Sequence, residues 1–113
     1  MKTSSCKAKA RRLQDFVVET IYKSFTQLRE GDVKPAIMGE SGIDIKLSPA
    51  AEDIIPFDIE CKNTEGFSRN SAIKQAEVNS KQNRIPIVVF KKNRSKTYSI
   101  ISLENLIKIV DNI

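Results

Sequence analysis

The chain contains no histidine and no tryptophan, and only two of its 113 residues are cysteine. Without histidine, the Ser-His and Cys-His pairs that activate nucleophiles in many enzymes cannot form. A zinc site is disfavoured as well, since two thiolates cannot fill the four positions of a structural zinc. Cys6 and Cys61 lie far apart, so their spacing does not indicate a disulfide framework. Any bound metal is therefore expected to be a hard cation held by oxygen ligands.

Long apolar runs are also absent. No apolar stretch approaches twenty residues and no signal-peptide pattern is present, so we expect a soluble, cytoplasmic protein without a membrane partner. The length is that of one ordinary domain, which predicts a single domain over residues 1–113. Hydrophobic residues make up 40% of the chain, enough to bury a modest core.

Basic residues, in contrast, are in excess and clustered. The formal net charge is +5, which suggests a polyanionic partner. One cluster lies in the first twelve residues, "MKTSSCKAKARR", and the other is "KKNRSK" at a predicted turn. Both clusters are either solvated surface patches or contacts for phosphates. In the second interpretation, the contacting residues are Lys7, Lys9, Arg11 and Arg12, and Lys91, Lys92, Arg94 and Lys96.

The first element predicted is a long helix that begins at Ser4 or Ser5 and ends near Arg29, before Gly31. Its apolar residues recur at helical spacing and comprise Val17, Val18, Ile21, Phe25 and Leu28. One turn earlier, the same stripe reaches Gln14, which we therefore expect to face inward.

The rest of the chain alternates strand and helix patterns. Short strands are expected over 34–38 and 43–47, a turn or loop at "SPAAED", and a third strand over 57–62. A helix over Arg69–Gln82 is capped by Ser68, and "IPIVVFK" is an apolar, central strand that pairs with "KTYSI". A closing helix follows Ser102. The predicted order is αβββαββα, an α/β fold with a mixed sheet and flanking helices.

Charged residues interrupt two of these strands. Because side chains alternate faces along a strand, Asp58, Glu60 and Lys62 share one face, and Phe57, Ile59 and Cys61 share the core face. If the strand that holds Asp44 is a neighbour, its carboxylate lies close to Glu60. Two close carboxylates repel unless a proton or cation lies between them. Mg²⁺ is a suitable cation, since it binds one or two carboxylates and accepts phosphate oxygens. Such a site can hydrolyse phosphodiesters, with Lys62 offsetting phosphate charge.

The bare pattern is weak, although this is the only E-x-K in the chain. The alternative is an edge strand whose charged face meets water, with Glu60 and Lys62 as a solvated pair. Asp58 is interpreted as an exposed residue or a salt-bridge partner.

These motifs together resemble the PD-(D/E)xK nuclease superfamily, and more closely the small Holliday junction resolvases of archaea and their phage-encoded relatives. The likeness is carried by "KAKARRLQDFVVETI", "GESGIDI", "IECKN" and "AIKQAEVNSKQNRIPIVVFKK", and spans most of the chain. The proline that often precedes the motif aspartate is absent, because Ile43 stands before Asp44.

The resemblance implies a restriction-endonuclease-like fold with Asp44, Glu60 and Lys62 as catalytic residues. It implies Asp44, Glu60 and the backbone carbonyl of Cys61 as metal ligands. Gln14 replaces the acid of the family's first helix, which removes a charge needed for a second metal ion. Accessory roles are open for Gln14, for Glu40 in the loop and for Gln75 in the second helix, and Ser41 can hydrogen-bond a phosphate. For Glu40, Gln75 and Ser41, the alternative is an ordinary surface role.

We therefore expect a Mg²⁺-dependent DNA endonuclease, with Mn²⁺ able to substitute, of the junction-resolving type and of phage origin in a bacterial or archaeal host. The alternatives are a site-specific homing or restriction-type enzyme, a DNA-degrading phage enzyme, and a non-catalytic DNA-binding module.

Paired symmetric cuts require two sites, so the resolvase hypothesis predicts a homodimer. The closing helix can supply its interface through an apolar stripe of Leu103, Leu106, Ile107 and Val110, with Ile109 and Ile113 to one side and left over for a partner. Alternatively, this helix only covers the sheet of its own protomer.

Overall fold

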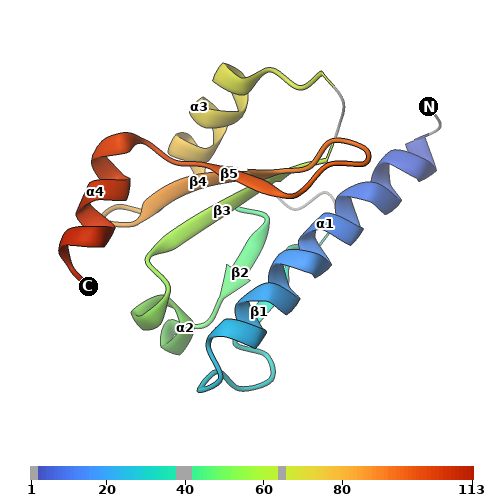
Figure 1. Cartoon of the computed structure of the whole chain (residues 1–113). Helices are drawn as coiled ribbons and strands as arrows, with labels where there is room; N and C mark the ends of the chain where they lie inside the picture. The colour runs from blue at the N-terminus through green and yellow to red at the C-terminus, as the bar shows by residue number, and fades with distance from the viewer. Residues whose placement is uncertain (1–2, 38–41, 64–65) are drawn as a thin grey trace.

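The computed structural model describes residues 3–37, 42–63 and 66–113, and of residues 3–6 only the backbone. This part of the chain forms an α/β fold of four helices and five strands (Figure 1). In order these are α1 (Thr3–Ser24), β1 (Val33–Pro35), β2 (Ile45–Leu47), α2 (Pro49–Ile54), β3 (Phe57–Lys62), α3 (Arg69–Asn79), β4 (Ile85–Phe90), β5 (Tyr98–Ile100) and α4 (Leu103–Asp111). The predicted α/β class is confirmed, but the strands form two small sheets rather than one mixed sheet, and the predicted order lacked one helix, α2.

Helix α1 packs through one stripe, in which Leu13, Val17 and Ile21 are buried. The inward position one turn before Val17 is therefore Leu13, and the expectation that Gln14 continues the stripe is wrong, since Gln14 is only half-buried. The helix also ends at Ser24, earlier than predicted.

The segment after α1 is fixed by side chains from elsewhere. The Tyr22 hydroxyl donates to the carbonyl of Arg29 at 3.0 Å and accepts from the backbone N–H of Val33 at 3.0 Å. Asp32 accepts hydrogen bonds from the backbone N–H of Arg29 and from the Ser48 hydroxyl, both at 2.7 Å, and these bonds lower the pKa of its carboxyl. The chain thereby turns back along α1 into β1.

The strands form two small sheets. β1 and β2 are antiparallel, and in the second sheet β4 is central, parallel to β3 and antiparallel to β5. The two sheets meet where the backbone N–H of Asp44 donates to the carbonyl of Ile59 at 3.1 Å. The adjacency of the Asp44 segment and β3, which the predicted site requires, is therefore present.

Both faces of the three-stranded sheet are covered. Ile59, Ile87 and Val89 join the main core against α1, as the alternation predicted for β3. On the other face, Ala72 and Ala76 of α3 pack on Val88, and their small side chains allow the helix to approach closely. Figure 1 shows α1 and α3 on opposite sides of β3 and β4. Helix α3 thus partly covers the charged face of β3.

The segment "SPAAED" is a helix rather than the predicted turn or loop. The Ser48 hydroxyl accepts from the backbone N–H of Ala51 at 3.1 Å, and Pro49 stands at the first helical position, where its missing N–H costs nothing. The cap of α3 is Ser68 and that of α4 is Ser102, as predicted, although α3 ends at Asn79.

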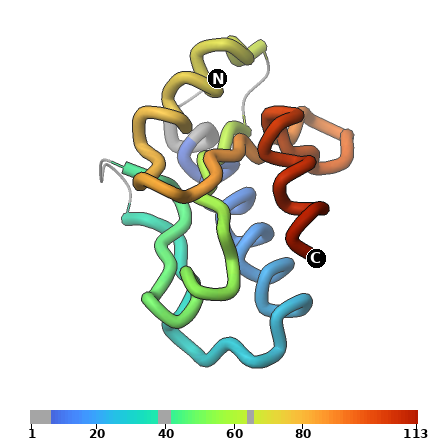
Figure 2. Tube along the Cα trace, turned by 90° about the vertical axis from the view of Figure 1, so that its left-hand side faces the viewer, coloured from blue at the N-terminus to red at the C-terminus, as the bar shows by residue number. Residues whose placement is uncertain are grey.

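Helix α4 stands at the outer edge of the molecule (Figure 2). Ile109 packs against the main core, so the expectation that it is left over for a partner is wrong. The predicted stripe is exposed instead, and comprises Leu103, Leu106, Ile107 and Val110. No helix in the described ranges is long and apolar enough to cross a membrane.

Candidate active site

Asp44 is fixed at the edge of β3 by two hydrogen bonds. Its backbone N–H donates to the carbonyl of Ile59 at 3.1 Å, and its Oδ2 accepts from the backbone N–H of Cys61 at 2.7 Å. The N–H and C=O of one strand residue point toward the same edge, so the Cys61 carbonyl also points toward the Asp44 side. The three predicted metal-binding groups therefore meet at one edge of β3.

Glu60 follows Ile59 on the opposite face of β3 and is only 3% exposed. Its Oε1 is buried without a hydrogen-bond partner among the residues that the structure describes. Burial and the nearby Asp44 carboxylate raise the pKa of Glu60 to about 7, against the opposing influence of the Lys62 ammonium and the Asn79 side chain. The two carboxyl groups thus lie close enough to repel each other, as the sequence predicted, and Glu60 is also desolvated, which the sequence did not predict.

Lys62 lies over Glu60 at the end of β3. Its Nζ donates to Oε1 of Gln75 at 3.0 Å and lies 4.0 Å from Oε2 of Glu60. The Lys62 side chain is 29% exposed, so the ammonium remains accessible while the α3 amide fixes its position. Gln75 therefore faces the site, as predicted.

The hydrogen bonds of Glu60 can be compared with those of Asp58, another buried acid on the same face of β3. Asp58 stands two residues before Glu60 and is 2% exposed. Its carboxylate accepts from Arg84 Nε at 2.7 Å, from the backbone N–H of Lys81 at 2.8 Å and from the Ser80 hydroxyl at 3.1 Å. Of the two predicted alternatives for Asp58, the salt-bridge partner is confirmed and exposure is wrong. A buried structural acid of this fold is fully paired, and Glu60 is not.

The donors at this edge fit a hard divalent cation. No group of three or more acid, cysteine or histidine side chains that could hold a metal occurs in the described ranges. Mg²⁺ does not need such a group, since one or two carboxylates suffice when water and substrate oxygens complete its coordination. The unpaired Oε1 of Glu60 and the adjacent Asp44 carboxylate meet this requirement. The Cys61 thiol packs on the core and its pKa is raised by burial and by both carboxylates, so it is not a nucleophile.

Of the other predicted accessory residues, Gln14 and Glu40, only Gln14 lies within the described part of the chain. Gln14 lies half-buried on α1 and makes no hydrogen bond to the carboxylates or Lys62 within the described part of the chain. Glu40 and Ser41 lie outside the described residues. Asn79, which sequence reasoning missed, influences Glu60 and donates to the carbonyl of Gly42 at 3.4 Å. Its spacing of four from Gln75 places both on one side of α3, a signal that could have identified it.

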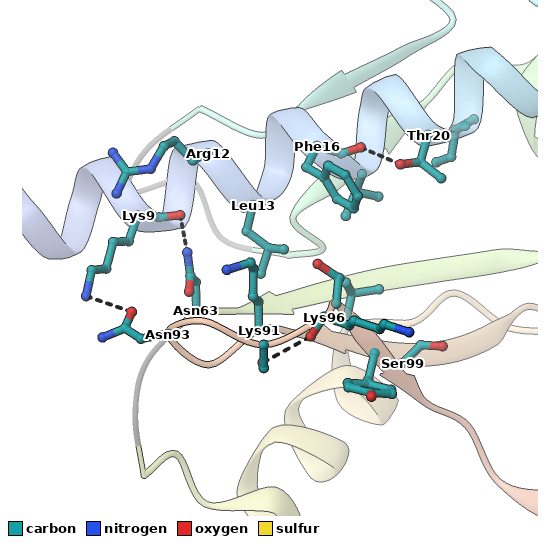
Figure 3. A pocket seen from close by; sticks show the side chains of 16 residues that line it. Lys9, Arg12, Leu13, Phe16, Thr20, Asn63, Lys91, Asn93, Lys96 and Ser99 are labelled. Atoms are coloured by element: carbon teal, nitrogen blue, oxygen red, sulfur yellow. Dashed lines mark hydrogen bonds between the residues drawn. The ribbon is translucent and has the colours of Figure 1, made fainter.

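The two basic clusters converge, although about eighty residues separate them in sequence. Lys9 on α1 donates from Nζ to Oδ1 of Asn93 in the turn between β4 and β5, at 3.2 Å. Both clusters contribute to the rim of one pocket, which Figure 3 shows between α1 and the two strands. The members at this rim are Lys9, Arg12, Lys91 and Lys96, whereas Lys7, Arg11, Lys92 and Arg94 are exposed outside it.

Comparison with known proteins adds no relative: no family model, no curated protein and no solved structure matches this chain.

Proposed function

We propose that the protein is a Mg²⁺-dependent DNA endonuclease whose catalytic residues are Asp44, Glu60 and Lys62. The observation that carries the proposal is the buried, unpaired Oε1 of Glu60 beside the Asp44 carboxylate. Such an arrangement is costly in a fold that pairs its other buried acid, Asp58, completely. A cation bound by both carboxylates removes this cost.

Each residue has a distinct role in phosphodiester hydrolysis. Asp44, Glu60 and the Cys61 carbonyl would hold the metal ion, which supplies charge neutralisation at the attacked phosphate and an acidified water. Lys62 donates to a phosphate oxygen and stabilises the charge that develops there. Gln75 positions the Lys62 ammonium through its 3.0 Å hydrogen bond.

The substrate that we favour is branched DNA of the Holliday junction type, cut by a homodimer. The fold that we infer for this role is the restriction-endonuclease-like arrangement, in which β3 and the Asp44 segment carry the site. Support for a dimer comes from the exposed apolar stripe of α4, since exposed apolar patches mark interaction surfaces. The alternatives remain a site-specific or DNA-degrading nuclease and a non-catalytic DNA-binding module.

A cleavage assay tests the proposal. Labelled junction, flap, duplex and single-stranded DNA are incubated with the protein in Mg²⁺, in Mn²⁺ and in EDTA. We expect cleavage only with metal, and none by Asp44→Asn or Glu60→Gln, both of which should still bind DNA. Glu77→Gln, an exposed acid on α3, is the matched control and should cut normally. Near wild-type cleavage by either site variant would refute the assignment, and DNA binding without cleavage by wild type would favour the binding module.

A further inference from the structure

The groove between α1 and the β4–β5 hairpin has a cavity volume of about 900 Å³ and has no role in the proposed active site. Its floor is apolar, formed by buried side chains that include Leu13, Val17 and Val89. Phe16 lines the groove and is 49% exposed. Figure 3 shows Leu13 and Phe16 on the side of α1 that faces the hairpin. Tyr98 also lines the groove and is 55% exposed, so the groove offers an apolar floor and two accessible aromatic rings.

The rim of this groove is cationic. Lys9 extends from α1, and Lys91 and Lys96 belong to the hairpin. Arg12 also lines the groove, although its guanidinium lies on the side of α1 away from the hairpin (Figure 3). No acid is among the described lining residues, and none of the four cations forms an ion pair with a described residue. The ligand that complements this surface is an anion with apolar, flat groups.

Single-stranded nucleic acid has this composition. Proteins that bind single strands combine a basic groove that follows the phosphates with apolar and aromatic surface on which bases stack. Duplex DNA fits less well, because its bases are stacked inside and its surface presents phosphates. The unpaired bases of a single strand can instead cover Phe16 and the apolar floor.

The Glu60 and Lys62 side chains lie on the α3 side of the sheet, whereas the groove lies on the α1 side and reaches the end of β3. Asn63, which directly follows Lys62, lines the groove and donates from Nδ2 to the carbonyl of Lys9 at 2.6 Å. The backbone N–H of Lys91 donates to the carbonyl of Lys62 at 3.2 Å. The end of β3 thus connects the proposed catalytic lysine with the rim.

We infer that the groove binds an unpaired DNA strand that continues past the end of β3 to the cleaved phosphate, with bases against the aromatic rings and phosphates on Lys9, Arg12, Lys91 and Lys96. This inference rests on the proposed nuclease function for the identity of the nucleic acid. It narrows the substrate class to DNA with an unpaired segment at the site of cleavage, such as a flap or an open branch point.

Binding in EDTA tests the inference separately from cleavage. Fluorescence anisotropy is measured with a labelled oligothymidylate, an abasic oligomer of equal length, and a duplex. Wild type should bind oligothymidylate at least about tenfold more tightly than the abasic strand, because only the former has bases to stack. Phe16→Ala should reduce this preference and leave duplex affinity unchanged, because Tyr98 remains as a second stacking surface, whereas Phe16→Tyr should retain it. Val78→Ala, which removes exposed apolar surface on α3, is the matched control.

Measurements of salt dependence and of oligomeric state complete the test of the inference. Arg12→Gln combined with Lys96→Gln should reduce the salt dependence of single-strand binding by a slope of about 0.7 for each phosphate that the protein no longer neutralises. Equal affinity for oligothymidylate and the abasic strand, or an unaltered preference in Phe16→Ala, would overturn the inference. So would a wild-type dimer that Phe16→Ala dissociates in sedimentation, since a second copy would then occupy the groove. If base preference is found but the site variants Asp44→Asn and Glu60→Gln still cut, the groove stands and the proposed active site fails.

Discussion

The backbone N–H of Cys61 donates a 2.7 Å hydrogen bond to Oδ2 of Asp44. This bond holds the Asp44 carboxylate against the edge of β3. Cys61, which donates the bond, directly follows Glu60, so the carboxylates of Asp44 and Glu60 lie close together. Because the bond comes from the backbone, no substitution at position 61 except proline, which has no N–H, removes it directly. The spacing of the two carboxylates is therefore built into the strand itself.

The repulsion between these carboxylates predicts how stability varies with pH. The pKa of Glu60 is about 7 in the folded protein, above its ordinary value of 4.5, so the folded state binds more protons between those limits. Glu60 therefore destabilises the metal-free protein progressively as pH rises from about 4.5 to about 7. Glu60→Gln should be more stable than wild type at pH 8 by up to about 3 kcal/mol, and nearly equal at pH 4.

Urea unfolding in EDTA at several pH values measures this difference. Adding Mg²⁺ at pH 8 should stabilise wild type and leave Glu60→Gln unchanged, because only the wild type carries both carboxylates. A stability difference that is constant with pH would show that Glu60 titrates normally.

Substitutions of Lys62 and Gln75 should distinguish a residue that takes part in cleavage from a residue that positions it. Lys62→Ala should slow cleavage by about two to three orders of magnitude, as removal of a charge-stabilising donor usually does. Gln75→Ala should slow it less, because the ammonium remains but is no longer fixed. Lys74→Ala, one position away and exposed, is the control. Single-turnover cleavage at saturating protein provides the rates, and a Lys62→Ala variant that is fully active but less stable would indicate a structural ion pair.

The buried pair of Asp58 and Arg84 should dominate the electrostatic contribution to folding. Arg84 Nε lies 2.7 Å from Asp58, and its NH2 group also donates to the carbonyls of Ile55 at 2.6 Å and Phe57 at 2.8 Å. Arg84→Met should destabilise the fold by about 3–5 kcal/mol, since a buried carboxylate is left unpaired.

The matched variant for this pair is Lys81→Ala, which breaks the exposed 2.9 Å ion pair with Glu52 and should cost less than about 1 kcal/mol. Equal effects of both variants on the urea midpoint would contradict the distinction between a buried and an exposed pair.

The exposed stripe of α4 predicts self-association. We expect a dimer near micromolar concentration by sedimentation equilibrium, converted to a monomer by Ile107→Glu without a decrease in thermal stability, because this side chain is 57% exposed. Ile109→Glu should instead unfold the protein, since Ile109 packs on the core. The dimer should place paired, symmetric nicks on a fixed junction in preference to linear duplex. A wild-type monomer that cuts duplex equally well would exclude the resolvase and leave the nuclease possible.

The sequence by itself determined the local features of the site. Alternation along residues 57–62 placed Glu60 and Lys62 on one face of β3, whereas the contact of Gln75 with Lys62 was suggested only by the family resemblance. Serine caps predicted the starts of α3 and α4. These features follow from backbone geometry within a few residues, which the amino-acid pattern records directly.

Only the tertiary structure decided which charges are buried and which are paired. The alternation could not show that α3 covers the second face of β3, or that Arg84, twenty-six residues away, pairs with Asp58. It also could not show that Oε1 of Glu60 lacks a hydrogen-bond partner among the described residues. Nor could it show that two basic clusters at opposite ends of the chain border one groove. Burial and pairing depend on which elements pack together, and that choice is made by the summed packing of the whole core rather than by local periodicity.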